Sequence, residues 1–178
     1  SGGFLPLDIL AQPNETTCGP TCLHAVYRFH GESIDLQQTI AEVRALDEGG
    51  TLAVFLACHA LRRGYRATIY TYNLQVFDPT WFQNPQTDIA EKLRQQLEAK
   101  PQDKLRVASE GYFEFLAGGG RLRFQELTVG LIRNYLKQGR PILTGLSATY
   151  LYNEAREHGP KCAPDDVRGL PAGHFVVL

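Results

Sequence analysis

The chain has 178 residues, a length typical of one domain of ordinary size. Hydrophobic residues make up 43% and charged residues 21%, and these proportions exclude an intrinsically disordered chain. The net charge is −1, from 18 Lys and Arg against 19 Asp and Glu, so we expect no nucleic-acid partner. No apolar run approaches the length of about 18 residues that a membrane helix needs, and we expect a soluble chain without a membrane span.

We interpret residues 4–178 as a single domain. Residues 1–3 (Ser-Gly-Gly) lack an initiator methionine and are set aside as a cloning remnant. The apolar run 175–178 has no turn residue or polar exit after it, so we expect the domain to be truncated at its C-terminal end. Four cysteines are too few for a disulfide framework and favour a reducing, cytoplasmic location.

Apolar spacing and capping residues predict the elements in chain order. Helices are expected over 18–30 capped by Thr16 or Thr17, over 33–45 capped by Ser33 and over 51–63 capped by Thr51. A strand follows over 65–72, then helices over 88–99, 104–116 and 128–138, and strands over 141–146 and 174–178. Helices come first and strands late, without βαβ alternation. This order predicts an α+β fold with N-terminal helices packed on a late antiparallel sheet.

The strongest chemical feature is the segment around Cys18. A thiol in the first turn of a helix faces the positive end of the helix dipole, which favours the nucleophilic thiolate. Gly19 leaves room for a substrate carbonyl because it has no Cβ. Gln12 precedes Cys18 by a short loop, and its side-chain amide together with the Cys18 backbone N–H would form an oxyanion hole.

A cysteine nucleophile needs a general base, and five histidines compete for that role. His24 and His30 fall on the helix of Cys18, His59 falls in the third predicted helix, and His158 falls in a polar stretch. His174 opens a predicted buried strand, where a side chain can point from a rigid edge into a cleft. We therefore predict His174 as the base.

These residues carry a resemblance to a known family. Gln12, the helix start Cys18-Gly19-Pro20 and the late strand beginning at Gly173 and His174 resemble the bacteriocin-processing, or double-glycine, cysteine peptidases. The resemblance implies a papain-like fold in a bacterial, cytoplasmic thiol protease. It implies Cys18 as the nucleophile, His174 as the general base and acid, and Gln12 as the oxyanion donor. The implied partner is a peptide or protein substrate, by analogy one ending in two small residues.

Two departures from the family pattern affect what the resemblance implies. The family's third catalytic member is an Asp or Asn on the strand after the histidine strand, but only four residues follow His174. Either that residue lies beyond Leu178, which we favour, or Asp165 or Asp166 replaces it, although an Asp pair at this position is more simply a turn. Better-studied members are joined to a membrane transporter, and nothing in this sequence spans a bilayer.

The remaining cysteines have simpler interpretations. Cys22 and Cys58 are expected to be small core residues, and Cys162 a loop thiol. Cys18 and Cys22 are four residues apart on one predicted helix, too far for a disulfide. Their spacing, without a second pair, is not that of a zinc site, and we expect no metal and no cofactor.

Two alternatives to a cysteine peptidase or amide hydrolase remain open. The first is a non-catalytic peptide-binding module on the same fold, in which Cys18 and His174 do not meet. The second is a structural protein with a redox-sensing thiol at Cys18. The sequence leaves the substrate, the cleaved bond, the third catalytic residue and the oligomeric state open.

Overall fold

The computed structural model describes residues 5–159 and 162–178, so the set-aside residues 1–3 lie outside the described residues. The fold is mixed α+β, as predicted, and divides into two compact units. Unit 1 combines Ser1–Ala41 with Tyr135–Leu178, whereas unit 2 is the continuous segment Glu42–Asn134. The two units are described separately below.

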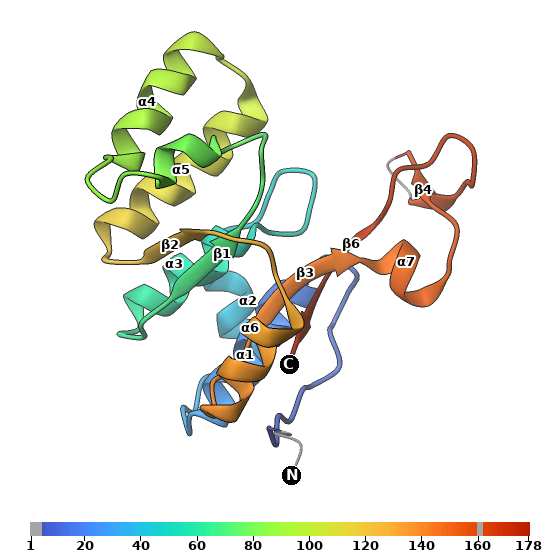
Figure 1. The fold of residues 1–178 in the computed structure, drawn as a ribbon. Helices are drawn as coiled ribbons and strands as arrows, with labels where there is room; N and C mark the ends of the chain where they lie inside the picture. The colour runs from blue at the N-terminus through green and yellow to red at the C-terminus, as the bar shows by residue number, and fades with distance from the viewer. Residues whose placement is uncertain (1–4, 160–161) are drawn as a thin grey trace. The chain divides into compact units, whose positions relative to one another are not determined.

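Unit 1 holds both ends of the chain and the late antiparallel sheet. Its elements are α1 (Cys18–Phe29), α2 (Leu36–Glu42, whose last residue belongs to unit 2), β3 (Leu143–Ser147), α7 (Ala148–Tyr152), β4 (Glu157–His158), β5 (Ala163–Pro164) and β6 (Gly173–Val177). The strands β3 and β6 pair antiparallel, with Leu146 opposite His174. Helix α1 packs against β6 (Figure 1), so an N-terminal helix covers the late sheet as predicted.

Helix α1 forms where its local signals place it. Thr17 occupies the N-cap position, but its side chain does not make the predicted capping bond, and Pro20 falls in the first turn, where a missing N–H costs nothing. The helix ends before Gly31, whose φ of +80° is a left-handed conformation that favours glycine. Ala25 and Tyr27 on its inner face are fully buried. These features explain why the predicted helix over 18–30 is confirmed.

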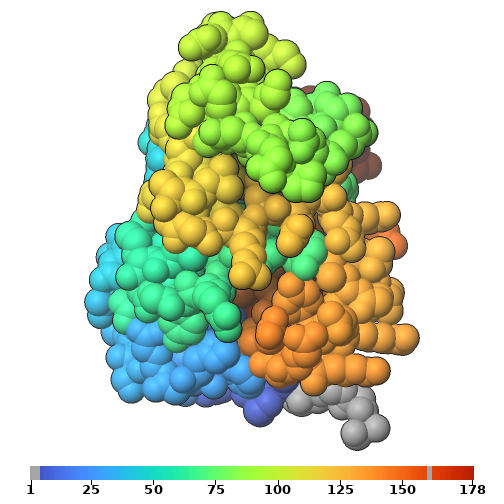
Figure 2. All heavy atoms as spheres, turned by 60° about the vertical axis from the view of Figure 1, so that its left-hand side comes forward, coloured from blue at the N-terminus to red at the C-terminus, as the bar shows by residue number. Residues whose placement is uncertain are grey.

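Unit 2 contains a hydrophobic core of buried residues. Its elements are α3 (Ala53–Arg62), β1 (Thr68–Thr71), the 3₁₀ helix η1 (Pro79–Phe82), α4 (Ile89–Ala99), α5 (Asp103–Ala117), β2 (Arg121–Phe124) and α6 (Val129–Lys137, whose last residues belong to unit 1). Helix α5 packs on both α3 and α4, and Figure 2 shows the side chains of α4 and α5 next to each other.

The core of unit 2 is built on buried aliphatic and aromatic side chains. Leu93 and Phe115 are completely buried, and the Phe77 and Tyr112 rings meet edge to face with centroids 4.7 Å apart. Gly111 lets α3 approach α5 closely, since a Cβ there would lie 2.7 Å from the Phe55 ring. Close packing of α3 on α5 therefore depends on a glycine in the middle of a helix.

Two predicted helix caps were wrong. The second helix does not start at Ser33 but at Leu36, where the Asp35 carboxylate accepts a hydrogen bond from the Gln38 backbone N–H at 3.2 Å. The third helix starts at Ala53, because the Thr51 hydroxyl donates to the Arg44 carbonyl at 2.7 Å and is not directed toward the helix. Ser33 and Thr51 both have side chains that are suited to capping. The neighbouring Asp35 caps the second helix instead of Ser33, and the Thr51 hydroxyl is engaged with the Arg44 carbonyl.

The sequence analysis also missed several short elements. β2 pairs parallel with β1, with Thr68 opposite Arg121 and Thr71 opposite Phe124, so the strands of unit 2 are parallel. The alternation of polar and apolar residues in Arg121–Phe124 was a signal for this strand. The one-turn helix α7 was missed as well, as were the two-residue strands β4 and β5.

In the described residues, no helix has both the length and the apolar character needed to cross a membrane.

Candidate functional site

Cys18 is the first residue of α1, as the sequence predicts, and its side chain is partly buried. The first helical hydrogen bond runs from the Thr21 N–H to the Thr17 carbonyl at 3.0 Å. Pro20 has no N–H to donate. No hydrogen bond is found for the Cys18 and Gly19 N–H groups anywhere in the described chain, which leaves two backbone donors at the positive end of the helix.

The coil before Cys18 is held by a compact set of hydrogen bonds. The Asn14 side-chain oxygen accepts from the Thr16 N–H at 3.0 Å and from the Thr16 hydroxyl at 2.8 Å. The Thr17 hydroxyl accepts from the Asn14 N–H at 3.3 Å and donates to the Asn14 carbonyl at 2.9 Å. Thr17 is 6% exposed and makes no capping bond to α1. Its hydroxyl therefore fixes the coil and leaves the helix amides free.

Gln12 lies in the same coil and is exposed. The Asp8 carboxylate pairs with the Arg28 guanidinium at 2.7 Å, which ties the start of this coil to the last turn of α1. Gln12 thus lies between two anchored points, at Asp8 and at Asn14. Its side chain makes no hydrogen bond within residues 5–159 and 162–178.

His174 is the second residue of β6, as predicted for the opening of a late strand. Its side chain is partly buried, and its backbone lies opposite Leu146 of β3. The Tyr152 ring meets the imidazole edge to face, with centroids 6.0 Å apart and ring planes at 68°. An aromatic ring therefore lies next to the imidazole of the predicted base.

One hydrogen bond joins the helix of Cys18 to the strand of His174. The Cys22 thiol donates to the Phe175 carbonyl at 3.4 Å. Residues four apart share one face of a helix, so the face that carries Cys18 and Cys22 is turned to β6. Burial and, second, the negative charge of a nearby Cys18 thiolate raise the pKa of Cys22 to about 11.

The structure thus brings the Cys18 helix and the His174 strand into contact within unit 1. It does not form the complete catalytic arrangement. In the part of the chain that the structure describes, no hydrogen bond joins the Cys18 sulfur to the His174 ring, and Gln12 is bonded to neither residue. Catalytic hydrogen bonds are often long before substrate binds, so this arrangement is compatible with a Cys–His pair.

His24 has a structural role. It is 3% exposed, and its Nε2 donates to the Ile34 carbonyl at 3.0 Å. This bond assigns the ring proton to Nε2 and leaves Nδ1 buried without a partner. His24 also lines a pocket of about 370 Å³, together with Leu10 and Arg28, and this pocket includes neither Cys18 nor His174.

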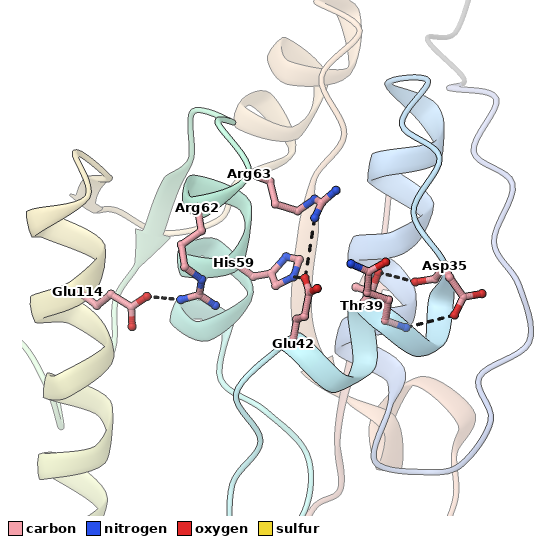
Figure 3. Close-up of polar contacts among 8 residues, drawn as sticks. Asp35, Thr39, Glu42, His59, Arg62, Arg63 and Glu114 are labelled. Atoms are coloured by element: carbon pink, nitrogen blue, oxygen red, sulfur yellow. Dashed lines mark hydrogen bonds and ion pairs between the residues drawn. The ribbon is translucent and has the colours of Figure 1, made fainter.

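His59 is committed to an ion-pair cluster in unit 2. It is 2% exposed, and its Nε2 lies 3.0 Å from a Glu42 carboxylate oxygen, which also lies 3.8 Å from the Arg63 guanidinium (Figure 3). Burial lowers the pKa of His59, and the bond to Glu42 opposes this effect. These residues and Arg62 line a pocket of about 300 Å³. His30 and His158 are exposed, so His174 remains the candidate base, on the strand that packs against the Cys18 helix.

The other thiols occupy the environments that the sequence predicts. Cys22 and Cys58 are each 2% exposed, and burial raises the pKa of Cys58 to about 11. Cys162 is exposed near the β4–β5 hairpin, where a hydrogen bond with Glu157 raises the pKa of its thiol. Each of these three thiols therefore has a specific reason for low reactivity at neutral pH.

Asp165 does not orient His174. Its Oδ1 accepts from the Val167 and Arg168 N–H groups at 3.0 and 2.8 Å, and its Oδ2 accepts from the Arg168 guanidinium at 2.7 Å. The Arg168 backbone bond, followed by its side chain, lowers the pKa of this carboxyl. Asp166 is exposed in the same turn. This segment is the solvated turn that the sequence analysis considered the simpler alternative.

No polar group orients the His174 ring within the described residues, and none of their His, Cys, Asp and Glu side chains form a group of three suited to a metal ion. The sequence analysis did not predict the supporting roles of Asn14 and Thr17 in the coil or that of Tyr152 beside the histidine. The Asn-Glu-Thr-Thr segment is rich in turn-forming residues and was a usable signal for the coil.

The chain matches no family model, and searches of curated proteins and of solved structures found no significant match.

Proposed function

We propose that this protein is a papain-like cysteine peptidase or amide hydrolase, similar to the bacteriocin-processing peptidases and acting on a peptide substrate in the cytoplasm. The observation that carries the proposal is the Cys22–Phe175 hydrogen bond of 3.4 Å, because it holds the Cys18 face of α1 against the strand of His174. A partly exposed thiol at a helix start then lies beside a strand with a partly buried imidazole. This combination is typical of an activated cysteine.

In the proposed reaction, His174 accepts the proton of the Cys18 thiol, and the thiolate attacks the carbonyl carbon of the scissile amide. A carbon–sulfur bond forms while the carbonyl electrons move to the oxygen. His174 then donates the proton to the leaving amine as the carbon–nitrogen bond breaks, which leaves a thioester on Cys18. Water, deprotonated by His174, attacks the thioester carbonyl; the carbon–sulfur bond then breaks to release the acid, and His174 returns the proton to the Cys18 sulfur.

The oxyanion formed in this reaction needs hydrogen-bond donors at the start of α1. The N–H groups of Cys18 and Gly19 have no partner in residues 5–159 and 162–178, and the helix dipole favours negative charge there. The Gln12 amide is proposed as a further donor. Its side chain makes no other hydrogen bond to the residues that the structure describes, and the coil that carries it is anchored at Asp8 and Asn14.

A specific observation also favours a second function, a peptide-binding module without turnover. The Cys18 sulfur and the His174 ring share no hydrogen bond in the described structure, and none of its polar groups orients the ring. A histidine without an orienting group is a poor base, because that group fixes its tautomer and stabilises the imidazolium. The two functions differ in whether His174 activates Cys18.

The deciding experiment is iodoacetamide labelling at neutral pH, followed by peptide mass spectrometry. A peptidase requires Cys18 to react first, and His174→Ala to slow that reaction by tenfold or more. His158→Ala is the matched control, since His158 is exposed on β4. Labelling of Cys18 that is unchanged in His174→Ala, or equal labelling of all four thiols, would contradict the peptidase and favour the binding module.

A further inference from the structure

The short helix α7 lies directly beside the predicted base. Strand β3 ends at Ser147, opposite Gly173 at the start of β6, and α7 begins at the next residue. The last residue of α7 is Tyr152, whose ring lies edge to face with the His174 imidazole at a centroid distance of 6.0 Å. After β3, helix α7 therefore brings the chain back beside His174, the residue that precedes Phe175 on β6.

Hydrogen bonds fix α7 against the segment that leads into β6. The Ala148 N–H donates to the Ala172 carbonyl at 2.8 Å, and the Ala172 N–H donates to the Thr149 hydroxyl at 3.1 Å. Ser147 caps the helix by accepting from the Tyr150 N–H at 3.3 Å. Two of these three bonds involve Ala172, two residues before His174. Tyr152 is thus the last residue of a helix that these hydrogen bonds hold in place.

The environment of Tyr152 is not that of a core residue. It is 53% exposed, so burial in the core does not explain its position. Asn153, the next residue, adopts a left-handed conformation with φ of +54° and ends the helix at this ring. Edge-to-face pairs between aromatic rings are favourable and directional, which lets one ring limit the rotation of the other.

We infer that Tyr152 is a positioning residue that holds the His174 ring toward the Cys18 helix and covers one side of the imidazole from water. The inference rests on the proposed function. It accounts for the absence of a polar orienting group around His174 in the described residues, because a fixed aromatic ring restrains the imidazole instead. The phenol hydroxyl has no part in this role, so phenylalanine should replace tyrosine.

The first test measures the geometry without activity. The ¹H resonances of the His174 ring are recorded by NMR in the wild type, Tyr152→Phe and Tyr152→Leu. We expect Tyr152→Phe to keep the resonances near their wild-type positions and Tyr152→Leu to move them, since the ring current is lost. Tyr150→Leu is the matched control because Tyr150 lies on the same helix and is 90% exposed. Unchanged resonances in Tyr152→Leu would overturn the inference.

The second test measures the consequence for Cys18. The rate of iodoacetamide labelling at Cys18 is followed against pH in the same variants. We expect Tyr152→Leu to lower the neutral-pH rate by about two- to tenfold, the range an aromatic pair provides, and to change the histidine-dependent limb of the pH profile. Tyr152→Phe and Tyr150→Leu should keep the wild-type profile.

The outcomes separate the two proposals. If His174→Ala slows Cys18 labelling but Tyr152→Leu does not, Tyr152 has no positioning role and the peptidase proposal stands. If His174→Ala leaves the labelling rate unchanged, both proposals are overturned. Circular dichroism of each variant shows whether a lower rate reflects loss of the fold.

Discussion

The Cys22 thiol donates a hydrogen bond to the Phe175 carbonyl oxygen at 3.4 Å, across 153 residues of sequence. This contact joins the second turn of the helix that begins at Cys18 to the strand that carries His174. Cys22 is 2% exposed, so the donor side of this part-buried contact is shielded from water. Its removal should loosen the pairing on which the proposed site depends.

We predict that Cys22→Ala lowers the free energy of unfolding by about 1–2 kcal/mol, through the lost packing of the buried sulfur and the lost hydrogen bond. Urea denaturation measures this change. The matched control is Cys162→Ala, which removes an exposed thiol and should change stability by less than about 0.5 kcal/mol. Equal effects of the two substitutions would show that the Cys22 contact does not stabilise unit 1.

Local sequence signals were sufficient to predict some helices and strands but not others. Pro20 in the first turn and Gly31 after the last turn delimit α1 by rules that act within a few residues, so the helix of Cys18 could be predicted. Ser33 and Asp35 are both good capping residues two positions apart, and only the observed bond to Gln38 decides between them. Strand β2 could not be paired with β1 because parallel pairing depends on contacts distant in sequence.

The residues of the candidate site also fall into those that local signals predict and those that depend on distant contacts. Cys18, Gln12 and His174 could be selected from residue type and position, since a helix start and a strand opening are local features. The Tyr152 contact depends on the register of β3 against β6, which places Ser147 opposite Gly173. No local pattern specifies that register. Residues that support the site were therefore harder to predict than the residues proposed to react.

Gly120 is a second point of close approach in unit 2. A Cβ at this position would lie 2.3 Å from the ring of Phe115, which is completely buried. We predict that Gly120→Ala destabilises the protein by about 1–3 kcal/mol, because the ring has no space to move away. The change is measured as a lower denaturation midpoint in urea.

The matched control for Gly120 is another glycine-to-alanine substitution. Gly130 lies within α6, and the nearest atom that its Cβ would meet is the Thr128 hydroxyl at 3.9 Å. Gly130→Ala should stabilise the protein by about 0.5–1 kcal/mol, since alanine has the higher helix propensity. A stabilising effect at both positions would contradict the close contact at Gly120.

The buried His59 predicts a dependence of stability on pH. Burial lowers its pKa in the folded protein, so the unfolded chain binds the proton more readily below its ordinary pKa of about 6.5. Stability contributed by neutral His59 is therefore present above this pH and is lost as pH falls toward the lower folded value. The facing charges are Glu42, which opposes the shift, and Arg62 and Arg63, which favour it.

We predict that His59→Gln reduces the loss of stability between about pH 7 and 5.5, where one such group contributes at most about 1.4 kcal/mol per pH unit. Urea denaturation at several pH values measures this slope. His158→Gln is the control, since His158 is exposed, and should keep the wild-type slope. A slope unchanged in His59→Gln would show that His59 does not cause the acid sensitivity.

The Thr17 hydroxyl makes two bonds to the Asn14 backbone, at 3.3 and 2.9 Å, immediately before Cys18. Thr17→Val keeps the shape of this buried side chain but removes both bonds, and should cost about 1 kcal/mol of stability. The freed coil should also no longer hold the backbone that leads into Cys18 in one conformation, which lowers the rate of Cys18 alkylation. Thr17→Ser retains the hydroxyl and should preserve the rate. If Thr17→Val alkylates at the wild-type rate while it loses stability, the hydroxyl stabilises the coil without positioning the nucleophile.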